Sequence, residues 1–159
     1  RVRDANSGQL REPYERSPLT GKLFDETGDR LTPSHTKSSS KAGAKRIRYY
    51  VSRRLVQGDT KDPSGWRLPA LKLERAVSSA IATHLAEHGD QLLAEPDAIA
   101  LYQVQDQVRE LHARLGKRED DILRSLPSTI TVSPHDLTIE LKRDAVAKAI
   151  NVSADALNE

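Results

Sequence analysis

Basic side chains at strand spacing are the feature of this sequence that most clearly points to chemistry. Seven basic residues and no acidic residue fall within Lys37–Arg54. Within this stretch, Arg46–Ser52 has the composition of a β-strand, and alternate side chains of a strand lie on opposite faces. Arg46 and Arg48 would project in parallel at roughly 7 Å, close to the spacing of successive phosphates along a nucleic-acid strand. The pattern predicts a phosphate-binding surface.

This strand is expected to have one apolar and one polar face. The apolar face, expected to pack on the core, consists of Ile47, Tyr49 and Val51. The polar face, expected to meet nucleic acid, consists of Arg46, Arg48, Tyr50 and Ser52. With neighbours that can neutralise or hydrogen-bond phosphate, the candidate DNA-binding residues are Arg30, Thr32, Ser34, His35, Lys37, Lys41, Lys45, Arg46, Arg48, Tyr50, Arg53 and Arg54. The alternative is an edge strand kept charged against aggregation.

Charge is distributed unevenly along the chain. The formal net charge is only +2. Residues 1–67 contain 15 Lys and Arg against 8 Asp and Glu, a net of +7, whereas residues 68–159 contain 10 against 15, a net of −5. Such asymmetry suggests that the first part meets a polyanion while the second has another task. The alternative, on composition alone, is that the basic run faces solvent and binds no polyanion.

Residue types that catalyse reactions or bind metals form no recognisable constellation. The chain has no cysteine, which excludes disulfides, thiolate catalysis and cysteine-based zinc sites. His84 and His88 have the i, i+4 spacing of a two-histidine metal site, but no third ligand is near in sequence, and a solvated helix face is the preferred interpretation. The sequence therefore predicts no catalytic centre, metal site, cofactor or small-molecule substrate.

The order of elements predicts an α+β fold in four segments. Residues 1–18 are polar and aperiodic, as in a linker or arm. Residues 19–67 form a basic β-hairpin region, 68–126 a helical hairpin, and 127–159 a closing β-hairpin with a short C-terminal helix. No window approaches the roughly 18 consecutive apolar residues that cross a bilayer, and the first residues have no signal peptide. We expect a cytoplasmic protein without a membrane partner, and a fragment of a longer one.

Turn signals predict the two β-hairpins. Gly28 can supply the positive φ of a turn over Glu26–Asp29, and Pro134 lies in a turn over Ser133–Asp136. The flanking strands are expected at Gly21–Asp25, Arg30–Thr32, Thr129–Val132 and Leu137–Leu141. We expect the two hairpins to pair in one small antiparallel sheet, from which the helices project as an arm.

Apolar periodicity predicts the two helices. The first follows Pro69 and has apolar residues at helical spacing: Leu73, Val77, Ala80, Ile81 and Leu85. The second, with Asp97 as its expected N-cap and Gly116 as a weak point, has a heptad seam: Leu101, Val104, Val108, Leu111, Leu115 and Ile122. Such a stripe suits a coiled-coil-like helical hairpin with its tip near His88–Asp97.

Several of these segments resemble one protein family. Ser17–His35, followed by a basic loop and Arg48–Ser52, resembles the region after the recombinase domain in large serine recombinases, most closely a cysteine-free group in which a β-hairpin replaces the zinc ribbon. Gly65–Ala70 is similar to a helix start of that family, and the strands around Pro134–Asp136 resemble its closing strands. The resemblance covers about Ser17 to Leu141.

The resemblance implies a function in DNA recombination. Such proteins cut and rejoin DNA through a serine on an N-terminal resolvase-type domain, so this chain would be their non-catalytic, DNA-binding C-terminal part. Double-stranded attachment-site DNA and other recombinase subunits would be its partners. A coiled-coil arm helps to decide which synapses form, so Leu92, Leu93 and Ile99 near the tip would be exposed for subunit contacts. The alternative is a protein-interaction module that uses the helical hairpin, with the basic strand serving solubility.

A first prediction concerns metal dependence. Without cysteine, the β-rich region must fold on its apolar faces alone. Prolonged treatment with EDTA should therefore leave the circular dichroism spectrum and the melting temperature unchanged. Loss of structure on chelation would reveal a histidine-based site instead.

Overall fold

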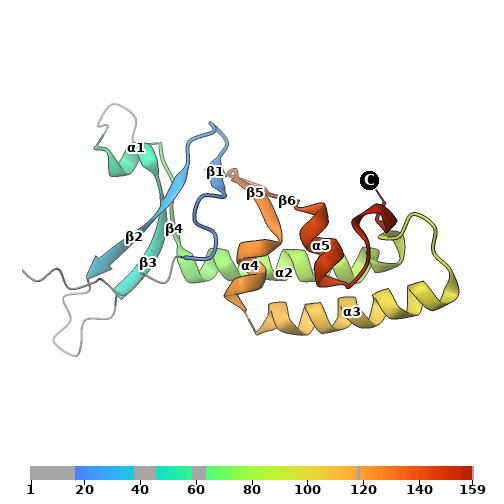
Figure 1. Cartoon of the computed structure of the whole chain (residues 1–159). Coiled ribbons are helices and arrows are strands. Elements are labelled where there is room, and N and C mark those ends of the chain that lie inside the picture. Colours follow the sequence, from blue (N-terminus) through green and yellow to red (C-terminus); the bar gives the residue numbers. More distant parts are fainter. Residues whose placement is uncertain (1–16, 38–45, 59–63, 118, 159) are drawn as a thin grey trace, which may run out of the picture.

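A computed structural model describes residues 17–37, 46–58, 64–117 and 119–158 of the chain. These residues form an α+β fold of two three-stranded sheets and a helical hairpin (Figure 1). No helix among them is long and apolar enough to span a bilayer. The linker expected over residues 1–18 lies almost entirely outside the described part.

The first sheet is antiparallel and is built around the basic strand. Its order is β2 (Leu31–Lys37), β3 (Arg46–Ser52) and β4 (Arg67–Pro69). β4 pairs only with Tyr49–Val51, so β2 and β3 continue past it as two paired strands. We call this extension, residues 35–37 and 46–48, the β2–β3 ribbon; it points away from the helices (Figure 1). The short helix α1 (Arg53–Val56) follows β3 directly.

The second sheet contains the closing hairpin. Its order is β1 (Leu23–Asp25), β5 (Pro127–Val132) and β6 (Leu137–Leu141). β5 and β6 are antiparallel, and the Ser133 N–H donates to the Asp136 carbonyl in the turn, which confirms the predicted hairpin.

The expected single antiparallel sheet is wrong. Gly28 does form a turn, with φ +82°, but the strands on either side of it join different sheets. β1 pairs in parallel with β5, where Leu23 lies opposite Ile130 and both side chains are fully buried. β2 turns away and pairs with β3. Burial of Leu23 in the second sheet therefore overrides continuation of the hairpin.

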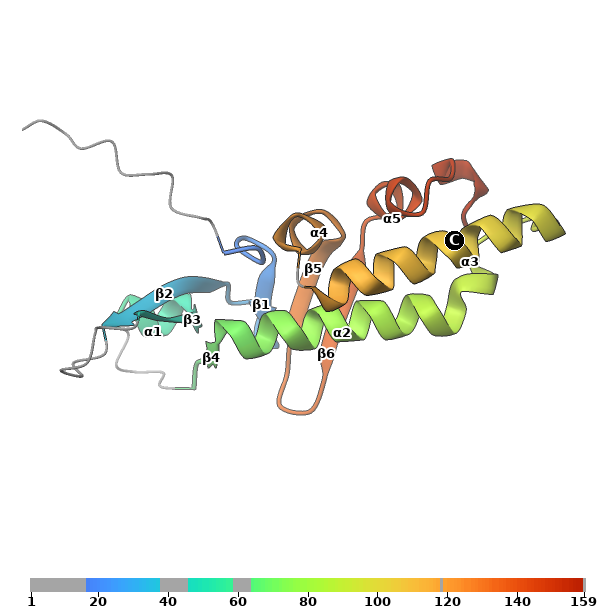
Figure 2. The ribbon, with the colours of Figure 1, turned by 90° about the horizontal axis from the view of Figure 1, so that it is seen from below.

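The predicted helical hairpin is confirmed. α2 (Ala70–His88) and α3 (Ala98–Gly116) lie side by side in both views (Figures 1 and 2). The Asp97 carboxylate caps α3 by accepting from the Ala100 N–H. Eight of the predicted apolar positions on the two helices are buried: Leu73, Val77, Ile81 and Leu85 in α2, and Val104, Val108, Leu111 and Leu115 in α3. Ala80, predicted on the same stripe, is exposed, and Leu101 is half-buried. The seam does not run on to Ile122, because α3 ends at Gly116 and that residue belongs to α4 (Asp120–Ser125).

The hairpin is not a free arm, contrary to expectation. A 3₁₀ turn (η1, Gly89–Gln91) forms its tip, and α5 (Arg143–Ala149) with a second 3₁₀ turn (η2, Ala154–Ala156) lies beside it (Figure 2). The Asn158 N–H donates to the Leu92 carbonyl, and Leu93 forms a β-bridge with Leu157.

The C-terminal segment changes which tip residues are accessible. Leu93 is only 6% exposed and Leu92 is half-buried, so the expected exposure of these two side chains is wrong. Ile99 is 72% exposed, as expected. The buried side chains form one cluster that extends from Leu19 at the ribbon end to Leu157 at the hairpin tip.

A matched pair of variants tests this packing. Leu93→Ala should lower the free energy of unfolding by about 2–3 kcal/mol, because it removes a buried side chain and leaves a cavity. Ile99→Ala should change it by less than about 0.5 kcal/mol, because that side chain is solvated. Urea unfolding of both variants measures the difference. Equal, small effects would mean that the C-terminal segment does not cover Leu93.

Candidate nucleic-acid interface

The face of β3 that was expected to meet nucleic acid points into the protein. Tyr50 and Ser52 are fully buried, whereas Ile47, expected in the core, is 42% exposed. Tyr49 is half-buried, and only Val51 of the expected apolar face is buried. The assignment of the two faces is therefore wrong at most positions. The physical reason is that α2 supplies a polar partner for the face that contains Tyr50.

That partner is the carboxylate of Glu74, which is buried on α2. The Tyr50 hydroxyl donates to Glu74 Oε1 at 2.9 Å and accepts from the Leu19 N–H at 3.3 Å. Arg48 Nη2 lies 3.1 Å from Glu74 Oε2, and its Nη1 donates to Ser17 Oγ at 2.9 Å. Burial, reinforced by the neighbouring Glu74 carboxylate, raises the pKa of Tyr50 far above its usual value, so the phenol remains a neutral donor.

Sequence reasoning missed Glu74, although a signal existed. This acidic residue lies beside Leu73 on the buried stripe of α2, where only 4% of it is exposed. Carboxylates are almost never buried without a partner. An acidic residue on that stripe could therefore have indicated a buried hydrogen-bond donor on another element.

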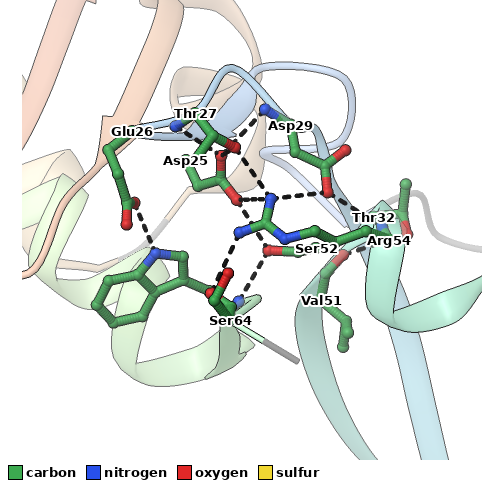
Figure 3. A network of polar contacts seen from close by, with 10 residues as sticks. Asp25, Glu26, Thr27, Asp29, Thr32, Val51, Ser52, Arg54 and Ser64 are labelled. Carbon is green, nitrogen blue, oxygen red and sulfur yellow. Dashed lines mark hydrogen bonds and ion pairs between the residues drawn. The ribbon is translucent and has the colours of Figure 1, made fainter. Parts of the chain in front are cut away.

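Arg54 is held by a second network of polar contacts (Figure 3). Its Nη1 lies 2.7 Å from Asp25 Oδ2 and 3.2 Å from Asp29 Oδ2, and its Nη2 donates to the Ser64 carbonyl. The Ser52 hydroxyl also donates to Asp25, at 3.2 Å. The guanidinium therefore joins the β1–β2 turn to the segment before β4, and it is held in the protein rather than presented to a partner.

Asp25 is charged in spite of its burial. Loss of hydration opposes its ionisation, but the Thr27 hydroxyl, the backbone N–H groups of Asp29 and Thr27, and the Arg54 guanidinium together hold the pKa of Asp25 below its usual value. Its side chain has no exposed surface. The ion pair is thus a fixed part of the fold.

The opposite side of the first sheet is the one available to a partner. Directly paired residues of antiparallel strands share a face, so the registers place eight residues together there, among them Pro69 at the end of β4 and Val51, which is buried. We call the other six the outer face; it consists of Thr32, Ser34, Thr36, Ile47, Tyr49 and Arg67. The Arg67 guanidinium lies over the Tyr49 ring, 4.5 Å from its centroid, in a cation–π contact.

Positive charge near the outer face exceeds the negative charge beside it. Within the described residues 17–75, the acidic side chains all have partners: Asp25 and Asp29 contact Arg54, Glu74 contacts Arg48, and Glu26 accepts from the Trp66 indole. Four described arginines of the same region are exposed: Arg30, Arg53, Arg67 and, on α2, Arg75. This part of the surface can therefore attract an anion.

The candidate DNA-binding residues thus fall into separate groups. Arg30 and Arg53 are exposed, and Thr32 and Ser34 lie on the outer face. His35 is exposed on the ribbon, where Lys37 and Arg46 pair at its open end. Three members are held by internal contacts: Arg48, Tyr50 and Arg54. Lys41 and Lys45 lie outside the described residues.

His84 and His88 contact each other rather than a third ligand. Their rings are stacked with centroids 4.6 Å apart, and His88 Nδ1 lies 3.0 Å from the His84 carbonyl. Among the described residues, no group of three or more His, Asp or Glu side chains is placed to hold a metal ion.

Comparison with known proteins gives similarity to solved structures only. No protein-family model and no curated protein matches the chain. One solved structure, described as "Sequence Requirements of the Listeria innocua prophage attP site", is 16% identical with a TM-score of 0.47, over 82% of this chain and 45% of that one. A second, "Crystal Structure of a LSR-DNA Complex", is 21% identical with a TM-score of 0.47, over 82% of this chain and 52% of that one.

The chain thus has a similarity to a large serine recombinase (LSR) structure solved with DNA. It spans about half the length of the two solved structures. At this identity the similarity concerns the fold alone, and no residue role follows from it.

The buried ion pair generates a pH-dependent prediction. Asp25→Asn should lower the free energy of unfolding at pH 7 by about 3 kcal/mol, because it leaves Arg54 without its buried partner. The folded-state pKa of Asp25 is lowered, so its stabilising effect is complete above the unfolded value of about 4 and is lost as pH falls through the folded one.

Urea unfolding from pH 7 down to pH 3 measures this effect. The difference in unfolding free energy between wild type and Asp25→Asn should shrink below about pH 4. The exposed carboxylate Asp155, changed to Asn, is the matched control and should show little difference at any pH. A difference for Asp25→Asn that does not change with pH would contradict the assignment.

Proposed function

We propose that this chain is the DNA-binding, non-catalytic C-terminal part of a serine site-specific recombinase, which contacts attachment-site DNA during integration or excision. The sequence resemblance over Ser17 to Leu141 supports the family. In this proposal the serine nucleophile belongs to a separate N-terminal domain, and the partners of this chain are double-stranded DNA and other recombinase subunits.

The outer face is the observation on which DNA binding depends. It combines hydroxyl groups of β2 with the stacked Tyr49–Arg67 pair. Hydroxyls and guanidinium groups are common donors to phosphate oxygens, and they set the position of a protein on the duplex. Arg30 and Arg53 lie near the same end of the sheet, where the Arg53 N–H donates to the Arg30 carbonyl.

The shape of the sheet supports entry into a groove. The B-DNA major groove is about 12 Å wide and admits a two-stranded β-ribbon. The β2–β3 ribbon is two-stranded because β4 ends at its base, and it projects from the body (Figure 1). Lys41 and Lys45 lie between the two strands in the sequence. The ribbon would enter the groove while the arginines at the other end of the sheet contact phosphates.

Arg53 and Arg67 are the residues to test. The double variant Arg53→Ala/Arg67→Ala should weaken binding to a mixed-sequence duplex by about tenfold or more, and should make the slope of log affinity against log salt shallower by about 1–2. Both side chains are exposed, so the fold should be retained. Fluorescence anisotropy at several salt concentrations measures both quantities.

A charge-matched control separates this surface from general attraction. Arg109→Ala/Lys148→Ala removes the same charge from exposed positions on α3 and α5. It should leave the affinity and the salt slope nearly unchanged. Equal losses in the two double variants, or binding that is insensitive to salt, would contradict the proposal.

A protein-interaction function is the second candidate, supported by exposed apolar side chains on α3. Ile99 and Tyr102 are each 72% exposed and lie three residues apart, on one side of the helix. If they contact another subunit, Ile99→Ser/Tyr102→Ser should spare DNA binding and impair synapsis by the intact recombinase. Lost DNA binding with normal synapsis would instead indicate that α3 contributes to DNA binding.

A further inference from the structure

Ile47 is an exposed aliphatic side chain on the part of the sheet that projects farthest. It lies directly opposite Thr36 in the β2–β3 ribbon, and this pair belongs to the outer face. Among the described residues, no strand pairs with β3 on the other side at this position, because β4 reaches only Tyr49. Ile47 therefore contributes little to the core, which leaves its methyl groups available to a partner.

The chemistry of the major groove offers one partner for such a side chain. Thymine places a 5-methyl group there, and apolar contact with that methyl distinguishes A·T pairs from G·C pairs. The polar groups of the other outer-face residues donate hydrogen bonds or positive charge, which suit phosphates and sugars rather than a methyl group. Ile47 is the fully aliphatic side chain of this face, so it can exclude water from a methyl group.

We propose that Ile47, with the Thr36 methyl beside it, contacts the 5-methyl groups of pyrimidines in the major groove and so favours thymine. This inference rests on the proposed DNA-binding function. Charge complementarity favours a duplex as the occupant of this surface, since Arg30, Arg53 and Arg67 are exposed on the same sheet and the described acidic side chains near it all have partners. In this arrangement the flanking arginines provide affinity, and Ile47 provides discrimination.

Base analogues test the contact without knowledge of the target sequence. Duplexes of alternating dA and dT are compared with duplexes of alternating dA and dU, which lack only the methyl group. Alternating dG and dC duplexes with and without 5-methylcytosine repeat the comparison in the other base pair. The full chain should bind each methylated duplex about fourfold more tightly, the effect of removing roughly one methyl group from water.

Variants assign that preference to one side chain. Ile47→Ala should abolish the preference for methylated duplexes, whereas Ile47→Val, which keeps both branches at Cβ, should retain most of it. Leu71→Ala is the matched control: Leu71 is 45% exposed, but it lies on α2, so the preference should persist. Circular dichroism of each variant verifies that the fold is intact.

The outcomes separate this inference from the proposed function. Salt-dependent binding with no preference for methylated duplexes, or a preference that survives Ile47→Ala, overturns the contact and leaves DNA binding in place. Absence of salt-dependent binding to any duplex overturns the proposed function and the contact together.

Discussion

The ion pair between Arg54 and Asp25 is placed where the chain passes from one sheet to the other. Asp25 ends β1 in the second sheet, and the turn after it leads into β2 in the first. Its carboxylate has no exposed surface, and removing one partner of such a pair leaves a buried charge. Because the Arg54 guanidinium also contacts Asp29 and the Ser64 carbonyl, the turn, α1 and the approach to β4 are held together. The orientation of the ribbon relative to the helices depends on this contact.

Glu74 has a corresponding effect at the base of α2. Its two carboxylate oxygens bind different residues of β3, Arg48 and Tyr50, so the helix and the strand have a fixed register. Each buried carboxylate therefore occupies one arginine of the basic run. The basic residues of Lys37–Arg54 therefore have two roles: Arg48 and Arg54 stabilise the fold, while other cations remain at the surface. Counting charge along the sequence cannot separate these tasks, since the partners lie 26 and 29 residues away.

Elements with local signals were predicted well from the sequence, and contacts between distant segments were not. The α2–α3 hairpin, the Asp97 cap and the closing β-hairpin depend on periodicity and turn residues, and all are confirmed. The alternation along β3 favoured burial of the face that contains Ile47 and Tyr49, because that face is the more apolar one. The opposite face is buried instead, and its Tyr50 and Arg48 contact Glu74, which lies 24 and 26 residues away and has no signal within the strand itself. The burial of Leu93 likewise depends on Leu157, for which no local pattern exists.

The inverted faces change how binding to DNA would work in the proposed complex. A face of arginines would have given the strand affinity but little discrimination, because phosphate contacts contain no sequence information. The outer face instead presents hydroxyls, an aliphatic side chain and one stacked guanidinium, Arg67, whereas Arg30 and Arg53 lie at the end of the sheet away from the ribbon. Affinity and discrimination would then belong to different parts of one sheet. Because Glu74 holds β3 through Arg48 and Tyr50, less of this strand would need to become ordered on binding in the proposed complex, which would lower the entropic cost.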